Sequence, residues 1–380
     1  MKLRKILVNK VEKEASLLGF GCMRFPTLEN GEVDFEESKR IVDYAVKQGV
    51  NYIDTAWPYH GGKSELIVRD IIKDYDRESF YLADKLPLWE VKTNEDIDRI
   101  FHEQLKKCGV EYFDFYLIHA VNKERYDQVL DLKVIEQLET YREQGKIRNI
   151  GFSFHDDLDT FKKWADMYDW DFCQIQLNYM DINHQQGMEG YDILTAKGIP
   201  VIIMEPVKGG SLVKFNDEIE GILKEYNSED SIASWAFRWV GSLPNVRVIL
   251  SGMSTMEQVE DNVKTFSNFV PMNTEELKII EKVRTEILAC SKVDCTSCNY
   301  CMPCPHGVDI PGNFRNFNRH AMYQNDNYTK WAYNQMKEKG ASADNCIDCG
   351  ECLPKCPQFI EIPTQLANFE QYLEDNGIIK

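Results

Sequence analysis

The fold of this chain is decided by the stretch "FDFYLIHAVNKERYDQVLDLKVIEQLETYREQGKIRNIGFS", residues 113–153. It begins and ends with short apolar runs, 113–119 and 147–153, as strands covered on both faces do. Between these runs, apolar residues recur at the spacing of one helix face: Leu130, Val134, Leu138 and Tyr141. The stretch therefore predicts two parallel strands that are joined by a crossover helix.

The same alternation of strand and helix patterns extends from residue 14 to residue 270. Eight strands are predicted, with the sequences "SLLGFG", "NYIDT", "FYLAD", "FDFYLIH", "IRNIGFS", "FCQIQLN", "PVIIME" and "VRVILSG". Eight strand–helix units in about 250 residues predict an α/β fold, a (β/α)₈ TIM barrel, with an open doubly wound sheet as the alternative. Residues 1–18 predict a hairpin before the first barrel strand.

A second, smaller domain is predicted after the barrel. Residues 273–288 have a periodic apolar face and a possible cap at Asn273 or Thr274, so we expect a helix there. We therefore divide the chain into a barrel domain with its hairpin, residues 1–288, and a mostly helical domain, residues 289–380. The aromatic and polar segment 313–340 is also predicted to be helical.

The overall charge limits the partners of the chain. Its 380 residues include 44 basic and 62 acidic ones, a formal net charge of -18, which argues against nucleic acid or an anionic membrane as the main partner. The sequence has no apolar stretch long enough to span a bilayer, and its first residues lack the pattern of a secretory signal. We expect a cytoplasmic protein.

Eight of the twelve cysteines lie in two short runs, "CTSCNYCMPC" (295–304) and "CIDCGECLPKC" (346–356). Without an export signal, metal binding is a better interpretation than disulfides. Each run has C-x₂-C-x₂-C spacing followed by a further cysteine before proline, which resembles the signature of a two-cluster bacterial ferredoxin. Two structural zinc sites are the alternative, although zinc motifs usually separate two cysteine pairs by a loop.

The ferredoxin resemblance implies that the fourth cysteine of each run binds the other cluster. One [4Fe-4S] cluster would then be held by Cys295, Cys298, Cys301 and Cys356, and the other by Cys346, Cys349, Cys352 and Cys304. The sequence departs from the signature once, because two residues rather than three separate Cys301 from Cys304.

Four polar residues follow consecutive predicted strands, where barrel enzymes place their chemistry. Asp54, Lys85 and His119 end three strands, and Tyr59 lies in the loop after Asp54. The ammonium of Lys85 is expected to lower the pKa of Tyr59, and Asp54 to position the lysine. Tyr59 could then protonate an oxyanion formed by hydride addition to a carbonyl, with His119 bonded to the oxygen. Each residue alone would more often be structural.

At these residues the sequence resembles the aldo-keto reductase family, from about residue 14 to residue 285. The segments that carry the resemblance are "GFGCMRFP", "DTAWPYHGGKSE", "YLADK", "FYLIHA" and "GKIRNIGFS". The resemblance implies the catalytic tetrad Asp54, Tyr59, Lys85 and His119, and NAD(P)H bound across the barrel mouth without a G-x-G-x-x-G motif. With the cysteine runs, the chain resembles the subgroup that carries a C-terminal 4Fe-4S ferredoxin-type domain.

The resemblance also implies nucleotide contacts, at Gly21, Met23, Ser153, Gln174, Val207, Lys208, Gly209, Ser254 and Asn262. Three positions depart from the family pattern. Phe154 replaces a frequent asparagine, Met204 replaces an aromatic residue that stacks on nicotinamide, and Gln258 replaces the arginine that binds the 2′-phosphate. These departures leave the choice between NADH and NADPH open.

These features together suggest an oxidoreductase that reduces a small carbonyl-type substrate and exchanges electrons with a redox partner protein through two clusters. Nicotinamide transfers two electrons as hydride, whereas a cubane transfers one, so a flavin could mediate between them. One alternative keeps carbonyl reduction in the barrel and gives the clusters only a structural role. Another is a non-catalytic redox sensor, against which the intact tetrad argues.

Overall fold

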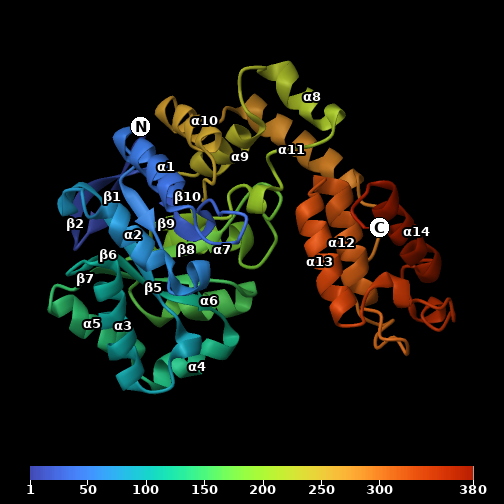
Figure 1. Ribbon diagram of the computed structural model, residues 1–380, viewed down its shortest axis with the longest axis horizontal. Helices are drawn as coiled ribbons and strands as arrows, with labels where there is room; N and C mark the ends of the chain where they lie inside the picture. Colours follow the sequence, from blue (N-terminus) through green and yellow to red (C-terminus); the bar gives the residue numbers. More distant parts are fainter. Residues whose placement is uncertain (380) are drawn as a thin grey trace. The chain divides into compact units, whose positions relative to one another are not determined.

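The computed structural model describes residues 1–379 and contains a closed barrel of eight parallel strands (Figure 1). Its strands neighbour one another in the order β10-β3-β4-β5-β6-β7-β8-β9. Their bounds are β3 Leu18–Gly21, β4 Tyr52–Asp54, β5 Tyr81–Leu86, β6 Phe113–Val121, β7 Ile147–Phe154, β8 Phe172–Gln176, β9 Val201–Met204 and β10 Val246–Ser251. The predicted TIM barrel is confirmed, and the doubly wound alternative is wrong.

Helices alternate with the strands along the chain. They are α1 Phe35–Lys47, α2 Ser64–Ile72, α3 Asn94–Cys108, α4 Lys123–Asp131, α5 Val134–Glu143, α6 Leu158–Met167, α7 Gly187–Ala196, α8 Asp217–Tyr226, α9 Ile232–Gly241 and α10 Met256–Ser267. Helix α3 shows how the sequence sets such bounds. A capping box of Thr93 and Asp96 starts it, and Gly109, with a φ of 66°, ends it.

Short 3₁₀ turns occur at Cys22–Arg24, Tyr59–Gly62, Arg77–Ser79, Leu88–Glu90, Lys208–Gly210, Ala343–Asn345 and Leu353–Lys355. In residues 1–379, no helix combines the length and the apolar character needed to cross a membrane.

The N-terminal hairpin is confirmed and closes one end of the barrel. Strands β1 (Leu3–Val8) and β2 (Val11–Ser16) are antiparallel, and Asn9 and Lys10 turn the chain with positive φ angles. Apolar hairpin side chains pack in one buried cluster with residues that begin barrel strands, such as Tyr52 and Phe172. The opposite end, where the strands finish, is therefore the end at which a site can form.

The contacts between residues divide the chain into two compact units. The first contains Met1–Gly209 and Ser234–Thr274, and the second contains Gly210–Ala233 together with the chain from Glu275. The second unit therefore includes α8 as well as the C-terminal helices. The predicted domain boundary between residues 288 and 289 stays a prediction.

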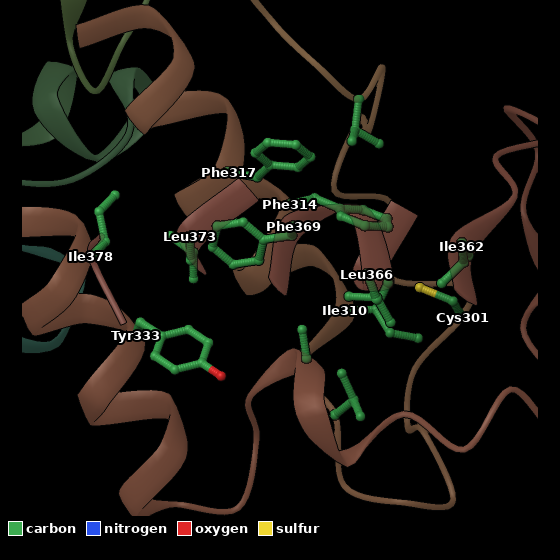
Figure 2. Packing of buried hydrophobic residues seen from close by; sticks show 13 residues of the cluster. Cys301, Ile310, Phe314, Phe317, Tyr333, Ile362, Leu366, Phe369, Leu373 and Ile378 are labelled. Atoms are coloured by element: carbon green, nitrogen blue, oxygen red, sulfur yellow. The ribbon is translucent and has the colours of Figure 1, made fainter. Parts of the chain in front are cut away.

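The C-terminal helices have a core of their own. They are α11 Thr274–Ala289, α12 Ile310–Tyr323, α13 Asp326–Glu338 and α14 Ile362–Asp375, so the helices predicted at 273–288 and within 313–340 are confirmed. Figure 2 shows Phe314 and Phe317 of α12 beside Phe369 of α14, with Tyr333 of α13 nearby. The rings of Phe317 and Phe369 are stacked with centroids 5.1 Å apart. These contacts hold α12 and α14 together.

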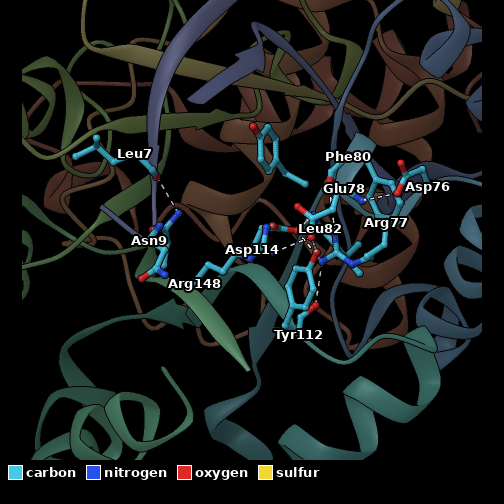
Figure 3. A network of polar contacts seen from close by, with 12 residues as sticks. Leu7, Asn9, Asp76, Arg77, Glu78, Phe80, Leu82, Tyr112, Asp114 and Arg148 are labelled. Carbon is cyan, nitrogen blue, oxygen red and sulfur yellow. Dashed lines mark hydrogen bonds and ion pairs between the residues drawn. The ribbon is translucent and has the colours of Figure 1, made fainter. Parts of the chain in front are cut away.

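A buried carboxylate ties together three neighbouring barrel strands (Figure 3). Asp114 of β6 accepts hydrogen bonds from Arg77 at 2.7 Å, from Arg148 of β7 at 3.0 Å and from the amide of Leu82 in β5 at 2.9 Å. Both guanidinium groups lie over the ring of Tyr112, at 4.0 and 3.9 Å from its centroid. Burial raises the pKa of Asp114 more than the two arginines lower it.

Replacing Asp114 by alanine should therefore destabilise the barrel by about 3–5 kcal/mol, because two arginines would lose their buried partner. Glu78 is a matched control, since it pairs with the same Arg148 but its side chain is 67% exposed. Glu78→Gln should change the unfolding free energy by about 1 kcal/mol or less. Urea unfolding of both variants measures the difference, and equal losses would contradict this account.

Candidate active site and cysteine sites

The structure brings the four predicted catalytic residues together at the barrel mouth. Asp54 ends β4, Lys85 lies near the end of β5, and His119 lies near the end of β6. Tyr59 begins the 3₁₀ turn after β4. The turn has positive φ angles at His60 and Gly61, and the His60 ring bonds to the backbone of Cys22 and Phe25 after β3.

Lys85 is the centre of this group. Its Nζ donates to Asp54 Oδ1 at 2.6 Å, to the carbonyl oxygen of Thr55 at 2.6 Å and to Tyr59 Oη at 3.3 Å. An ammonium has three hydrogen-bond donors, so all of them have a partner. The side chains of Lys85 and Asp54 are 1% and 2% exposed, respectively. The pair is therefore a buried ion pair that contacts the tyrosine hydroxyl.

The surroundings keep Lys85 charged and Tyr59 protonated. Burial lowers the pKa of Lys85, but Asp54 and Tyr59 together raise this pKa by more, so the net shift is upward. For Asp54, burial raises the pKa more than Lys85 lowers it. Burial also raises the pKa of Tyr59 by more than Lys85 lowers it. The predicted lowering of the Tyr59 pKa is therefore wrong as a net effect, because the sequence did not reveal how deeply the hydroxyl is buried.

His119 stands beside Tyr59 as a neutral imidazole. The two ring centroids are 6.3 Å apart in an edge-on arrangement, and the Trp89 ring is 5.0 Å from His119. Burial, followed by the charge of Lys85 and by His155, holds the pKa of His119 well below its usual value. Its Nδ1 is buried and has no hydrogen-bond partner within residues 1–379. A neutral ring can still donate one hydrogen bond, as an oxygen ligand would require.

Two predicted nucleotide contacts lie on adjacent strands of the same mouth. Ser153 of β7 and Gln174 of β8 are paired in register. The Ser153 hydroxyl accepts a hydrogen bond from the Ala120 amide at 2.8 Å, whereas Gln174 Oε1 is buried without a partner in the described chain. An unpartnered amide oxygen suits the carboxamide of a nicotinamide ring. Phe154 is fully buried, and its ring packs on Phe161 of α6 instead.

The loop after β9 carries Val207, Lys208 and Gly209. Lys208 and Gly209 have φ angles of 52° and 63°. The Lys208 ammonium is 2.5 Å from Asp181 Oδ1, and this carboxylate also accepts hydrogen bonds from Gln176 and Asn178. The lysine predicted to contact a pyrophosphate therefore already has an anionic partner in this structure.

Arg24, which was not predicted as a site residue, directly follows Met23 and contacts Ser254, two of the remaining predicted contacts. Gly21 ends β3 and Met23 is 54% exposed. The Ser254 hydroxyl donates to the carbonyl oxygen of Arg24 at 2.7 Å, and the Arg24 guanidinium lies 3.8 Å from the Glu205 carboxylate. Arg24 could have been noticed in the sequence, because it is a basic residue directly after the predicted contact Met23.

Two polar residues of α10, Asn262 and Gln258, form hydrogen bonds within the protein. Asn262 is buried, and its amide donates to Ser251 Oγ at 3.1 Å. Gln258 Oε1 accepts a hydrogen bond from the Ser254 amide at 2.8 Å and so helps to cap the start of α10. Gln258 therefore offers no positive charge to a 2′-phosphate.

The cysteine runs form two cavities in the second unit. One is lined by Cys295, Cys298, Cys301 and Cys356. The other is lined by Cys304, Cys346, Cys349 and Cys352, and by Cys301 as well. Each run thus contributes its last cysteine to the cavity of the other run. All twelve cysteines are free of disulfides.

The four cysteines predicted to bind each cluster line the same cavity, and four thiols are a donor set that fits an iron–sulfur cubane. The other lining residues include apolar side chains, among them Ile310 and Phe314 in the first cavity and Val308 and Leu366 in the second. Within residues 1–379, no three histidine, cysteine or acidic side chains are arranged for a single metal ion.

Known proteins show similarity to both parts of the chain. The sequence pattern of the aldo/keto reductase family matches residues 17–285, and that of a 4Fe-4S dicluster domain matches residues 294–360. The uncharacterized oxidoreductase YqkF of Bacillus subtilis is 24% identical over 73% of this chain and 96% of its own length. The NADH-specific methylglyoxal reductase of Escherichia coli is 24% identical over 69% of this chain and 93% of its own.

A shorter similarity connects the chain to a probable aldo-keto reductase of Glycine max, 30% identical over 37% of this chain and 42% of that protein. Among solved structures, aldo-keto reductase AKR11C1 from Bacillus halodurans, in its holo form, superposes with a TM-score of 0.62 and 23% identity, over 74% of this chain and 96% of its own. An aldo-keto reductase from Klebsiella pneumoniae in complex with NADPH superposes with a TM-score of 0.60 and 20% identity, over 75% of this chain and 96% of its own. This chain belongs to the aldo/keto reductase family of oxidoreductases and carries a 4Fe-4S dicluster domain after its barrel.

Proposed function

We propose that this protein is an iron–sulfur oxidoreductase that reduces a small carbonyl compound with NADH or NADPH. The observation that carries the proposal is the buried ammonium of Lys85, which contacts both Asp54 and Tyr59 at the barrel mouth. The similarity to a methylglyoxal reductase makes a small aldehyde the first substrate to test.

The tetrad residues supply the proton and the charge that the reduction needs. A nicotinamide nucleotide, when bound, supplies hydride to the carbonyl carbon. Tyr59, which holds its proton because of burial, donates that proton from Oη to the carbonyl oxygen. Lys85 stabilises the resulting tyrosinate, and Asp54 keeps the lysine in place. Neutral His119 donates a hydrogen bond that orients the carbonyl oxygen.

The nucleotide would lie along the contacts that the family resemblance implies. Ser153 and Gln174 would hold the carboxamide, and the unpartnered oxygen of Gln174 supports this assignment. Val207, Lys208 and Gly209 would hold the pyrophosphate, which requires Lys208 to leave Asp181 at least in part. The outer contacts would be Gly21, Met23, Ser254 and Asn262.

The two cysteine cavities would each hold one [4Fe-4S] cluster, with the crossed ligand sets that line them. Such clusters, when bound, carry single electrons. We propose that they exchange electrons with a redox partner protein. Clusters carry one electron at a time and hydride carries two, so electron exchange between the clusters and the nucleotide needs a mediator such as a flavin. The flavin content of the anaerobically purified protein should therefore be measured.

The Tyr59 assignment predicts the effect of removing one hydroxyl. Tyr59→Phe should slow methylglyoxal-dependent oxidation of NADH or NADPH by about 10²–10⁴-fold, because the general acid is lost while the ring remains. Nucleotide affinity and iron content should stay unchanged. Tyr81→Phe is the control, since that hydroxyl bonds to Glu14 of the hairpin. A fully active Tyr59→Phe enzyme would show that another group gives the proton.

The neutral Gln258 predicts weak discrimination between the two nucleotides. Because its side chain caps α10 and carries no charge, the dissociation constants of NADH and NADPH should differ by about tenfold or less. Fluorescence titrations measure both constants. A strong preference for NADPH that disappears in Arg24→Gln would contradict this prediction and would assign the 2′-phosphate to Arg24.

The crossed ligation predicts which cluster each cysteine supports. Cys304→Ser should damage the cluster held by Cys346, Cys349 and Cys352 and spare most of the other, because Cys304 lines that cavity. Cys346→Ser should give the same iron content and electron paramagnetic resonance spectrum. If Cys304→Ser instead matched Cys295→Ser, each run would hold its own cluster.

A further inference from the structure

The glycine loop after β9 continues into a buried serine. The chain passes through Gly209 and Gly210 to Ser211, which is 1% exposed. Ser211 belongs to the same compact unit as helix α12, and its hydroxyl receives a hydrogen bond from Arg319 Nη2 of that helix at 3.2 Å. A residue two positions beyond the proposed pyrophosphate contact Gly209 is therefore held by α12.

Arg319 is fixed in place by stacking rather than by an ion pair. Its guanidinium lies 3.9 Å from the ring centroid of Tyr328 and 5.9 Å from that of Tyr323. Within residues 1–379 no carboxylate lies at ion-pair distance from it, and its buried Nε has no hydrogen-bond partner. Besides these two rings, the described chain offers Arg319 a hydrogen bond to the Ser211 hydroxyl, and we expect a movement of Ser211 to be transmitted to Arg319 through it.

Asn318, the preceding residue of α12, holds the backbone just before Cys295, which lines the first cysteine cavity. Asn318 Oδ1 accepts hydrogen bonds from the amides of Lys292 and Val293, each at 2.9 Å, and its Nδ2 donates to the carbonyl oxygen of Val293 at 2.7 Å. The same carbonyl oxygen accepts a hydrogen bond from the Cys295 amide at 2.8 Å. Asn318 thus fixes the backbone that leads directly into Cys295.

We infer that α12 couples nucleotide binding to the first cysteine site, with Arg319 as the positioning residue on the nucleotide side and Asn318 on the cysteine side. The inference rests on the proposed function. Phosphate binding at Val207–Gly209 would shift the loop that ends in Ser211. Arg319, which holds Ser211, and Asn318 are consecutive residues of one helix, which packs through Phe314 and Phe317. Coupling of this kind is reciprocal, so the state of the cluster must change nucleotide affinity by the same factor.

The test compares nucleotide affinity in two redox states of the holoprotein. Dissociation constants for NADH are measured by equilibrium dialysis with the clusters oxidised and after reduction by dithionite, which supplies one electron to each cluster. The two constants of the wild-type protein should differ by about fivefold or more. Arg319→Gln removes the guanidinium donor of this hydrogen bond, and Ser211→Ala removes its hydroxyl acceptor. In both variants the ratio of the two NADH dissociation constants should fall to near one.

Two controls separate this coupling from a structural effect. Arg319→Lys keeps a donor for Ser211 and should restore part of the ratio. Arg315→Gln changes an exposed arginine one turn earlier on α12 and should keep the full ratio. Iron and sulfide contents show that each variant carries its clusters, and Ser211→Ala decides the result if Arg319→Gln loses iron.

The outcomes distinguish this inference from the proposed function. A wild-type protein that binds NADH with equal affinity in both redox states overturns the coupling and leaves carbonyl reduction intact. A ratio that persists in both Arg319→Gln and Ser211→Ala overturns the role of the Arg319–Ser211 contact. A protein that binds neither NADH nor NADPH overturns the proposed function and the coupling with it.

Discussion

The buried ammonium of Lys85 is the interaction on which the barrel site depends. A charge at 1% exposure is stable only if it is paired and hydrogen-bonded, so Asp54, Thr55 and Tyr59 must each be held within reach of one nitrogen atom. The parallel register of β4 and β5 brings Asp54 and Lys85 to the same end of the barrel. Apolar side chains of the hairpin fill the other end, so they and the polar residues around Lys85 lie at opposite ends of the barrel.

The second constraint is the crossing of the two cysteine runs. Cys304 and Cys356 each line the cavity whose other three cysteines belong to the opposite run, and Cys301 reaches both cavities. A group bound by these cysteines would link Cys304 to Cys346 in one cavity and Cys301 to Cys356 in the other, segments that a small helical core alone would hold weakly. Helix α12 lies between the two runs in sequence and contributes Ile310 to both cavities. The core around Phe317 and the two sites therefore share residues of α12.

Local patterns in the sequence were sufficient for the fold. Apolar runs of strand length and helical repeats predicted all eight barrel strands, the hairpin and the helices on either side of the first cysteine run, because these features depend on residues close in the chain. The convergence of Asp54, Lys85 and His119 was also predictable, since parallel strands in a barrel end on the same side.

Features that depend on distant contacts or on burial could not be predicted. The net pKa shift of Tyr59 depends on how much of its hydroxyl is buried. The partner of Lys208 is Asp181, 27 residues earlier, and the partner of Ser211 is Arg319, 108 residues later. No periodicity or motif connects such pairs. Arg24 was the exception, since it adjoins a predicted contact and could have been found.

The central claim is that the barrel transfers hydride to a carbonyl carbon while Tyr59 gives the proton. The most direct test uses NADH or NADPH that carries deuterium at both C4 positions of the dihydronicotinamide ring, with methylglyoxal as substrate and the anaerobically purified holoprotein. The account predicts one deuterium at the former aldehyde carbon for each nucleotide oxidised. A reduced product without deuterium, or reduction that proceeds only with a one-electron donor such as dithionite, would contradict it.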